Sequence, residues 1–297
     1  MVFVAVCASN AANASDAAIC DRAFNQSNWK QALQSCTRAA RLGDGEAQLT
    51  LGAMYDQGQG VAQDYTQAVY WYTLAAQQGV EGAQHNLGGM YDSGRGVAQD
   101  YEKAVYWYMQ AANQGNGWAQ IRLGSMYRRG EGMQQNYTLA VHWYTRAANN
   151  GYHDAQFNIG RMYDLGEGVR QDYTEAVRWY TLAAKLDSLA QLRLGQMYDR
   201  GQGVAQDYRQ AVRWYTLAAI QGGSDAQHNL ALMYAHGRGV AQNNVVAHMW
   251  FNIAARSGDA YSIKSRDAVA ARMTREQVAQ AQALASKCIA QKYKNCN

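Results

Sequence analysis

The sequence predicts an all-α solenoid of about six helix-pair repeats, each about 36 residues long, with divergent caps at its ends. Two observations predict it. An Ala-Gln dipeptide recurs at spacings of 36, 36, 36, 35 and 36 residues, beginning at Ala47, Ala83, Ala119, Ala155, Ala190 and Ala226. A Met-Tyr pair follows each dipeptide after seven residues, and a tryptophan follows it after 24. A fixed period of this length indicates a repeat array rather than two ordinary domains.

The composition excludes several classes of protein. The 297 residues include no proline, 17% are charged, and the formal net charge is +4. A disordered chain would be rich in proline and poor in aromatic residues, and no apolar run approaches the roughly 20 residues of a membrane span. The small positive charge does not favour nucleic-acid binding, which needs a clearly basic face. We therefore expect no nucleic-acid partner and no transmembrane segment.

Residues 1–14 are expected to be a truncated signal peptide. A short apolar run precedes Ala12-Asn13-Ala14, which fits an A-x-A cleavage site. No Lys or Arg precedes Arg22, so the usual positive start is missing, and the true start codon would lie upstream. Two alternatives stay open. One is a frayed N-terminus, and the other is lipidation at Cys7, although Val6 stands where a small residue is wanted.

Residues 15–43 are predicted to form a capping helix pair that turns near Asn28. A terminal unit cannot bury its face on two neighbours, so its sequence diverges from the repeat. Cys20 and Cys36 lie at equal distances from this turn, and antiparallel helices would therefore set them opposite each other. We expect a disulfide there, because the two residues would lie within disulfide reach.

Residues 44–258 hold the six repeats, and each is expected to form two helices. In the first repeat, apolar residues share one face of a helix that ends at Gly58, since glycine is the usual left-handed cap. Asp64 starts the second helix as an N-cap whose carboxylate accepts amide protons. Gly52 lies within the first helix, where glycine costs roughly 1 kcal/mol relative to alanine. Its recurrence in the next four repeats indicates that a neighbouring helix approaches closely.

These repeats resemble the Sel-1-like repeat family, a relative of the tetratricopeptide repeat. The motifs that carry the resemblance are A-Q-x-x-L-G-x-M-Y, G-x-G-V, D-Y-x-x-A-V-x-W-Y and A-A-x-x-G, over residues 44–258. The resemblance implies a right-handed α/α superhelical solenoid of an exported bacterial type that binds other proteins. The family loop often carries a proline that this chain lacks, so its loops are expected to be less rigid.

Residues 259–297 are predicted to form C-terminal capping helices and a tail. Thr274 and Gln277 match a capping box at the start of the closing helix. Cys288 and Cys296 would be about 12 Å apart in a continuous helix, so they pair only if the helix ends between them. Disulfides at both caps persist in oxidising compartments, and we expect a periplasmic or secreted protein. The alternative is a cytosolic protein with reduced cysteines.

No catalytic, cofactor or metal site is predicted. The six histidines form no helical zinc pattern, and the G-x-G loops lack the continuation of a phosphate-binding loop. Ser27-Asn28-Trp29-Lys30 matches the S-x-x-K motif of penicillin-recognising enzymes. Neither S-D-N nor K-T-G follows it, and Ser27 fits better as a helix cap. The chain is therefore expected not to be an enzyme.

The first helix of each repeat has a second face opposite the repeating core, at positions 46, 50, 53 and 57 and their equivalents, which we call the first-helix face. Its residues vary between repeats, and in related arrays first helices line a concave groove. The middle three repeats place five arginines there, and arginine binds carboxylates well. The sequence predicts a basic groove for a protein or peptide partner with acidic groups, contacted by Trp118, Arg122, Arg129, Phe157, Arg161, Arg193, Gln196, Arg200 and Asn229. The alternative is a solvated polar face with scattered arginines.

The leading hypothesis for function is a non-enzymatic protein–protein interaction scaffold of the bacterial cell envelope. One alternative is an immunity protein that neutralises a periplasmic toxin. A second is a hydrolase acting on β-lactams or the cell wall, for which the repeats supply no nucleophile–base pair. A third is a purely structural spacer with a featureless groove. The sequence does not name the partner, the envelope process or the oligomeric state.

Overall fold

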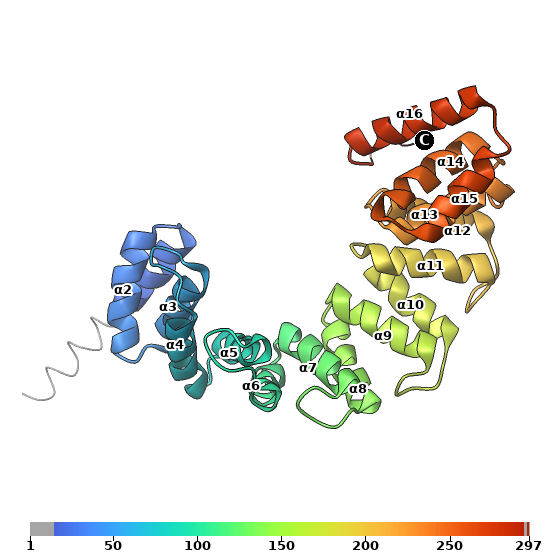
Figure 1. The fold of residues 1–297 in the computed structure, drawn as a ribbon. Coiled ribbons are helices and arrows are strands. Elements are labelled where there is room, and N and C mark those ends of the chain that lie inside the picture. The colour runs from blue at the N-terminus through green and yellow to red at the C-terminus, as the bar shows by residue number, and fades with distance from the viewer. Residues whose placement is uncertain (1–14, 294–295, 297) are drawn as a thin grey trace, which may run out of the picture. The chain divides into compact units, whose positions relative to one another are not determined.

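The structure, a computed structural model, describes residues 15–293 and residue 296. The chain forms two compact units that divide between Asn150 and Gly151, and the described residues of both are helical with no strand (Figure 1). The all-α class that the sequence predicts is therefore confirmed. The expected signal peptide and the candidate lipidation site at Cys7 lie outside the described residues.

The N-terminal unit consists of helix pairs stacked in chain order. Its helices are residues 15–25, α2 (Trp29–Arg41), α3 (Gly45–Gln57), α4 (Tyr65–Gln77), α5 (Glu81–Ser93), α6 (Tyr101–Asn113), α7 (Gly117–Arg129) and α8 (Tyr137–Asn149). From α2 onward each helix packs against the next. Three repeats occupy this unit as the pairs α3–α4, α5–α6 and α7–α8.

The C-terminal unit continues the same plan with three repeats and a cap. Its helices are α9 (His153–Leu165), α10 (Tyr173–Ala183), α11 (Ser188–Arg200), α12 (Tyr208–Ala219), α13 (Ser224–His236), α14 (Asn244–Ala254), the short 3-10 helix η1 (Ala255–Ser257), α15 (Ala260–Ala270) and α16 (Arg275–Ala290). Helix α14 packs against α13, α15 and α16. The cap therefore covers the last repeat through α14.

The helix ends follow from the capping residues of the repeat. Gly58 ends α3 with a φ of 69°, and the Asp64 carboxylate accepts hydrogen bonds from the Thr66 and Gln67 amides at the start of α4. At the C-terminal cap, Thr274 and Gln277 form the predicted capping box of α16. These local predictions are confirmed, but the expectation that Ser27 caps a helix is wrong, because the N-cap of α2 is Asn28.

The recurring mid-helix glycine faces a tyrosine ring of the second helix in the same repeat. A Cβ atom added to Gly52 would lie 2.6 Å from Tyr72 Cδ1, and one added to Gly88 would lie 2.8 Å from Tyr108 Cδ1. The close approach predicted from glycine's recurrence is therefore present, and a tyrosine side chain makes it.

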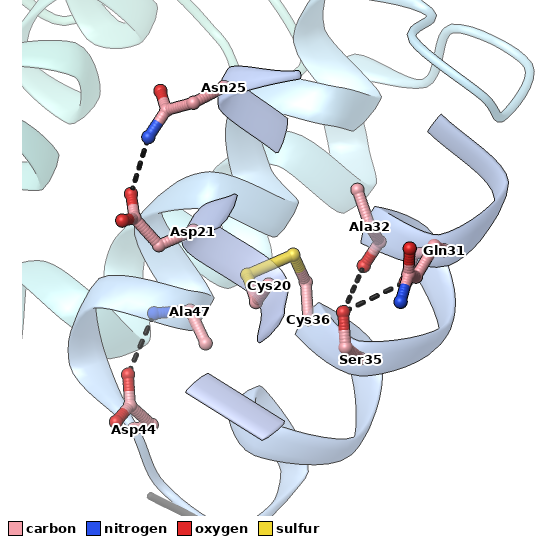
Figure 2. The surroundings of a disulfide bond; sticks show 9 residues. All are labelled: Cys20, Asp21, Asn25, Gln31, Ala32, Ser35, Cys36, Asp44 and Ala47. Carbon is pink, nitrogen blue, oxygen red and sulfur yellow. Dashed lines mark hydrogen bonds between the residues drawn. A yellow bond between two sulfur atoms is a disulfide. The ribbon is translucent and has the colours of Figure 1, made fainter. Parts of the chain in front are cut away.

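A disulfide closes each terminal cap in the structure. Cys20 and Cys36 are joined, which links helix 15–25 to α2 (Figure 2). Cys288 and Cys296 are joined after α16 has ended at Ala290, so the helix does end between them. All four cysteines are buried.

Candidate partner-binding face

The first-helix face lies on α3, α5 and α7 in the N-terminal unit and on α9, α11 and α13 in the C-terminal unit. Helix α7 carries three of the predicted contact residues, α9 two, α11 three and α13 one. In chain order they are Trp118, Arg122 and Arg129; Phe157 and Arg161; Arg193, Gln196 and Arg200; and Asn229. Two of the five predicted arginines therefore belong to the N-terminal unit and three to the C-terminal unit.

In the N-terminal unit, Arg122 is engaged by the preceding repeat. Its guanidinium forms an ion pair with Asp92 at the end of α5. The same carboxylate accepts a hydrogen bond from Tyr108 Oη at 3.1 Å. Burial and the neighbouring Asp92 carboxylate raise the pKa of Tyr108 well above its ordinary range. Arg122 therefore helps to join two repeats, and Asp92 offsets much of its charge.

The other two α7 residues differ in their exposure and surroundings. Trp118 is 53% exposed on the first-helix face. Arg129 lies 3.3 Å from the Glu131 carboxylate in an exposed pair, which stabilises the fold little but offsets its charge. The N-terminal unit therefore presents a less basic face than its two predicted arginines suggest.

In the C-terminal unit, the α9 residues lie partly in the core and the α11 residues face solvent. Phe157 stacks at a tilt on Tyr180, with ring centroids 5.7 Å apart, and packs against the core. It is therefore an edge of the core and only partly available as an anchor. Arg161 is half-buried. Arg193 and Arg200 are exposed, and Arg193 donates a hydrogen bond to Gln196 Oε1 at 3.2 Å.

Helix α13 is flanked by two cavities on this face. The larger, of about 250 Å³, lies among α11, α13 and the start of α15 and is lined by Gln196, Asp225, His228, Asn229, Asp259 and Tyr261. The smaller, of about 110 Å³, is lined by Asp199, Asn229, Leu232, Met233, His236 and Arg238. Asn229 belongs to both. The predicted contact residues Gln196 and Asn229 therefore lie at hollows of the surface.

His228 is held in place by the C-terminal cap. Its Nδ1 lies 2.8 Å from Ser262 Oγ on α15, and its ring meets Phe251 edge-on at 5.2 Å. Burial lowers its pKa, so the imidazole is neutral at neutral pH. The sequence does not predict this serine–histidine contact, because the two residues lie 34 positions apart. Ser262 is 1% exposed, so a substrate cannot reach its hydroxyl, and the contact serves to hold α15 on α13.

Comparison with known proteins decides the family. A family model described as Sel1 repeat matches residues 45–80, 82–116, 119–152, 153–188, 188–223 and 224–259. The chain belongs to the Sel1 repeat family. No curated protein matches the chain.

Several solved structures are similar to this chain. A Sel1 repeat protein from Oxalobacter formigenes is 33% identical, with a TM-score of 0.72 over 80% of this chain and 96% of that chain. A protective antigen of uropathogenic Escherichia coli with an SLR fold is 26% identical, with a TM-score of 0.54 over 96% of this chain and 85% of that chain. An immunity protein from Pseudomonas aeruginosa is 19% identical, with a TM-score of 0.45 over 68% of this chain and 80% of that chain.

The family assignment confirms the resemblance drawn from the motifs and the α/α solenoid class. Sel1 repeat proteins are protein-interaction scaffolds. Within the described residues, no group of three His, Cys, Asp or Glu side chains is arranged to hold a metal ion. No helix in that part of the chain combines the length and apolar character of a membrane span.

Proposed function

We propose that this Sel1 repeat protein is a non-enzymatic interaction scaffold of the bacterial cell envelope that binds a protein partner on the first-helix face of its C-terminal unit. The observation that carries the proposal is the pair of cavities beside α13, which share Asn229. They lie on the face whose residues vary between repeats, beside a core that repeats. A surface that is hollowed and variable suits a specific protein contact.

The α11 arginines supply the charge for such a contact. Arg193 and Arg200 are seven residues apart, which is close to two helical turns, so both project toward the same side of α11, and both are exposed. Arginine is enriched among residues that dominate binding energy at interfaces. Acidic groups of the partner would therefore bind along α11, in line with the acidic partner predicted from the sequence.

The paired cysteines support a location outside the cytoplasm. Disulfides persist in oxidising compartments and are rare in the cytosol, and the structure joins all four cysteines of its described part in two pairs. Intact mass spectrometry of alkylated protein isolated from its native cells checks this. A gain of 4 Da on reduction is expected from two disulfides, and reduced cysteines in freshly isolated protein would contradict an envelope location.

A partner captured from an envelope extract and then purified tests the proposed face. Replacing both arginines, Arg193→Ala with Arg200→Ala, should weaken its affinity at least tenfold. The matched control is Arg178→Ala with Arg213→Ala, which removes two exposed arginines from the second helices α10 and α12 of the same unit. Equal affinities for wild type and the α11 variant would reject the face. Turnover of nitrocefin by the purified protein would reject the non-enzymatic assignment.

A further inference from the structure

We propose that the 250 Å³ cavity among α11, α13 and α15 binds a lysine or arginine side chain of the protein partner. The proposal rests on the proposed function and adds the chemistry that the partner must present at one end of the face. It differs from the sequence-based expectation, in which the partner contributes acidic groups.

The charge of the cavity favours a cation. Its lining includes the carboxylates of Asp225 and Asp259, and neither lysine nor arginine is among its six lining residues. Asn229 adds a carboxamide oxygen, which accepts hydrogen bonds from ammonium or guanidinium groups, whereas the Gln196 oxygen already accepts one from Arg193. An anionic group placed here would meet two like charges, and like charges brought together at an interface are strongly unfavourable.

His228 does not offset this negative charge. The Asp225 and Asp259 carboxylates line the same cavity as its ring, and both act to raise its pKa. Burial outweighs them and lowers the pKa, so the ring carries no charge at neutral pH. Its Nδ1 atom is already engaged by Ser262 Oγ. The lining therefore carries a net charge of about −2 at neutral pH.

One carboxylate is held in a fixed orientation before any ligand arrives. Asp259 is the N-cap of α15; its Oδ2 accepts the Ser262 amide proton at an N–O distance of 2.7 Å, and its Oδ1 accepts the Tyr261 amide proton at 3.4 Å. A carboxylate has about four acceptor positions, so the two cap bonds leave others available toward the cavity. Asp225 lies in the first turn of α13 and is exposed. A cation would therefore meet one fixed and one adjustable carboxylate.

The size of the cavity and its aromatic rim suit a single side chain. Pockets for drug-sized ligands measure roughly 300–1,000 Å³, so about 250 Å³ is enough for one long side chain. The Tyr261 ring lines the cavity and is 79% exposed. A tyrosine face attracts a cation within about 6 Å. An exposed aromatic ring beside two carboxylates therefore favours a lysine or arginine head group.

The C-terminal unit thus offers opposite charges on one face. Arg193 and Arg200 on α11 attract acidic groups, while Asp225 and Asp259 attract a basic one. A partner segment with acidic residues alone would be repelled at the α13 end. This arrangement would select a partner that carries both signs in the matching order, because repulsion of the wrong partner contributes to specificity.

The experiment uses Nα-acetyl-arginine methylamide as the probe and follows the His228 imidazole resonances of the full chain by NMR. A saturable shift is expected, with the glutamate and norleucine analogues giving none. Asp225→Asn with Asp259→Asn should raise the dissociation constant of the arginine probe at least tenfold. Asparagine is as good an N-cap as aspartate, so α15 keeps its start. Asp225→Asn alone, which leaves the α15 cap intact, should raise the constant at least threefold.

Asp154→Asn is the matched control. Asp154 lies on α9 at the position in its repeat that is equivalent to Asp225, and it does not line this cavity. Binding of all three probes alike, binding of none, or an arginine affinity unchanged in the double variant would overturn the proposal. Affinity for the purified partner separates this proposal from the proposed function. If the partner binds wild type and the Asp225–Asp259 variant equally but loses affinity in the Arg193–Arg200 variant, the face stands and the cavity proposal fails.

Discussion

Each first helix of the six repeats contains a buried glutamine, and in three of the repeats the side chain of this glutamine connects three helices. Gln48 Nε2 donates to the Ala40 carbonyl at the end of the preceding second helix, and Gln84 donates in the same way to Ala76. Gln78, which follows α4, donates in turn to Gln48 Oε1 at 2.7 Å. Both ends of the buried carboxamide are thereby satisfied, as a buried polar group requires.

The third repeat lacks half of this arrangement, and one substitution should supply it. Asn150 stands where Gln78 and Gln114 stand in the first two repeats, and Gln120 Oε1 is buried without a hydrogen-bond partner. Asparagine is one methylene too short to reach it. Asn150→Gln should raise the free energy of unfolding by about 0.5–1.5 kcal/mol, the usual net contribution of a hydrogen bond. Urea denaturation checks this, with Asn149→Gln at the neighbouring exposed position expected to have no effect.

Two adjacent glycines of α5 should respond to alanine in opposite directions. A Cβ on Gly88 would meet the Tyr108 ring at 2.8 Å, whereas one on Gly89 meets nothing closer than Tyr108 Oη at 3.6 Å. Gly88→Ala should lower the free energy of unfolding by about 1–3 kcal/mol through overpacking. Gly89→Ala should raise it by about 0.4–1 kcal/mol, because it restricts the unfolded chain. Equal effects of the two variants on urea midpoints would contradict the packing argument.

The sixth repeat shows which feature of Tyr108 keeps its ring from shifting away from a Cβ atom at position 88. There, buried Ala231 replaces the glycine and buried Phe251 takes the place of the tyrosine. Phe251 has no hydroxyl, while Tyr108 is fixed to Asp92 through its Oη atom. Removing that hydroxyl with Tyr108→Phe should therefore reduce the destabilisation caused by Gly88→Ala. A double-mutant cycle measures this coupling.

At the scale of helices, the two disulfides should stabilise the terminal caps. They close segments of 16 and 8 residues, for which loop-closure entropy predicts roughly 3 and 2.5 kcal/mol. Cys20→Ser with Cys36→Ser should therefore destabilise the first helix pair. Hydrogen exchange should become faster in helix 15–25 and α2 and stay unchanged in α6. Faster exchange throughout the N-terminal unit would instead mean that this unit unfolds as a whole when its cap is lost.

Helices and their ends were predictable because their signals are local. Gly58 and Asp64 act within one turn of the helix ends that they define, and the six-fold repetition identifies the same signals in every unit. The contacts of the first-helix face were not predictable in this way. Arg122 and Asp92 lie 30 residues apart in different repeats, and the periodic pattern does not say which side chains meet across that boundary. The interpretation of Arg122 as a fully available charge therefore missed its partner.

For the molecule as a whole, the sequence predicts the number and kind of repeats, since each unit must bury its core on the next. It does not predict the cavity at α13, because two of the six lining residues come from the start of the cap helix α15. Asp259 ends the last matched repeat and Tyr261 lies beyond it, at the start of α15, so the six repeat copies do not show which side chains α15 places beside Asp225. A site formed where a repeat array meets its cap can therefore be located only from the three-dimensional structure.

Both units should lose stability steeply in alkaline solution. Tyr72 and Tyr108 in one unit and Tyr180 and Tyr215 in the other have pKa values raised above their ordinary value of 10.0, first by burial and then by a neighbouring aspartate. The folded state holds these phenols protonated, whereas the unfolded chain releases the protons near pH 10. Stability is therefore complete below about pH 10 and falls as pH rises toward the raised pKa values.

The slope of that loss distinguishes the tyrosines from other groups. Each such tyrosine contributes up to about 1.4 kcal/mol per pH unit within this window, so two per unit give up to about 3 kcal/mol per pH unit. Urea midpoints measured from about pH 8 to 11 check this. Tyr180→Phe with Tyr215→Phe should make the loss shallower in the C-terminal unit. The variant should be less stable at about pH 8, since the Tyr180 hydroxyl no longer donates to Asp164. An unchanged alkaline slope in this variant would show that other groups control the transition.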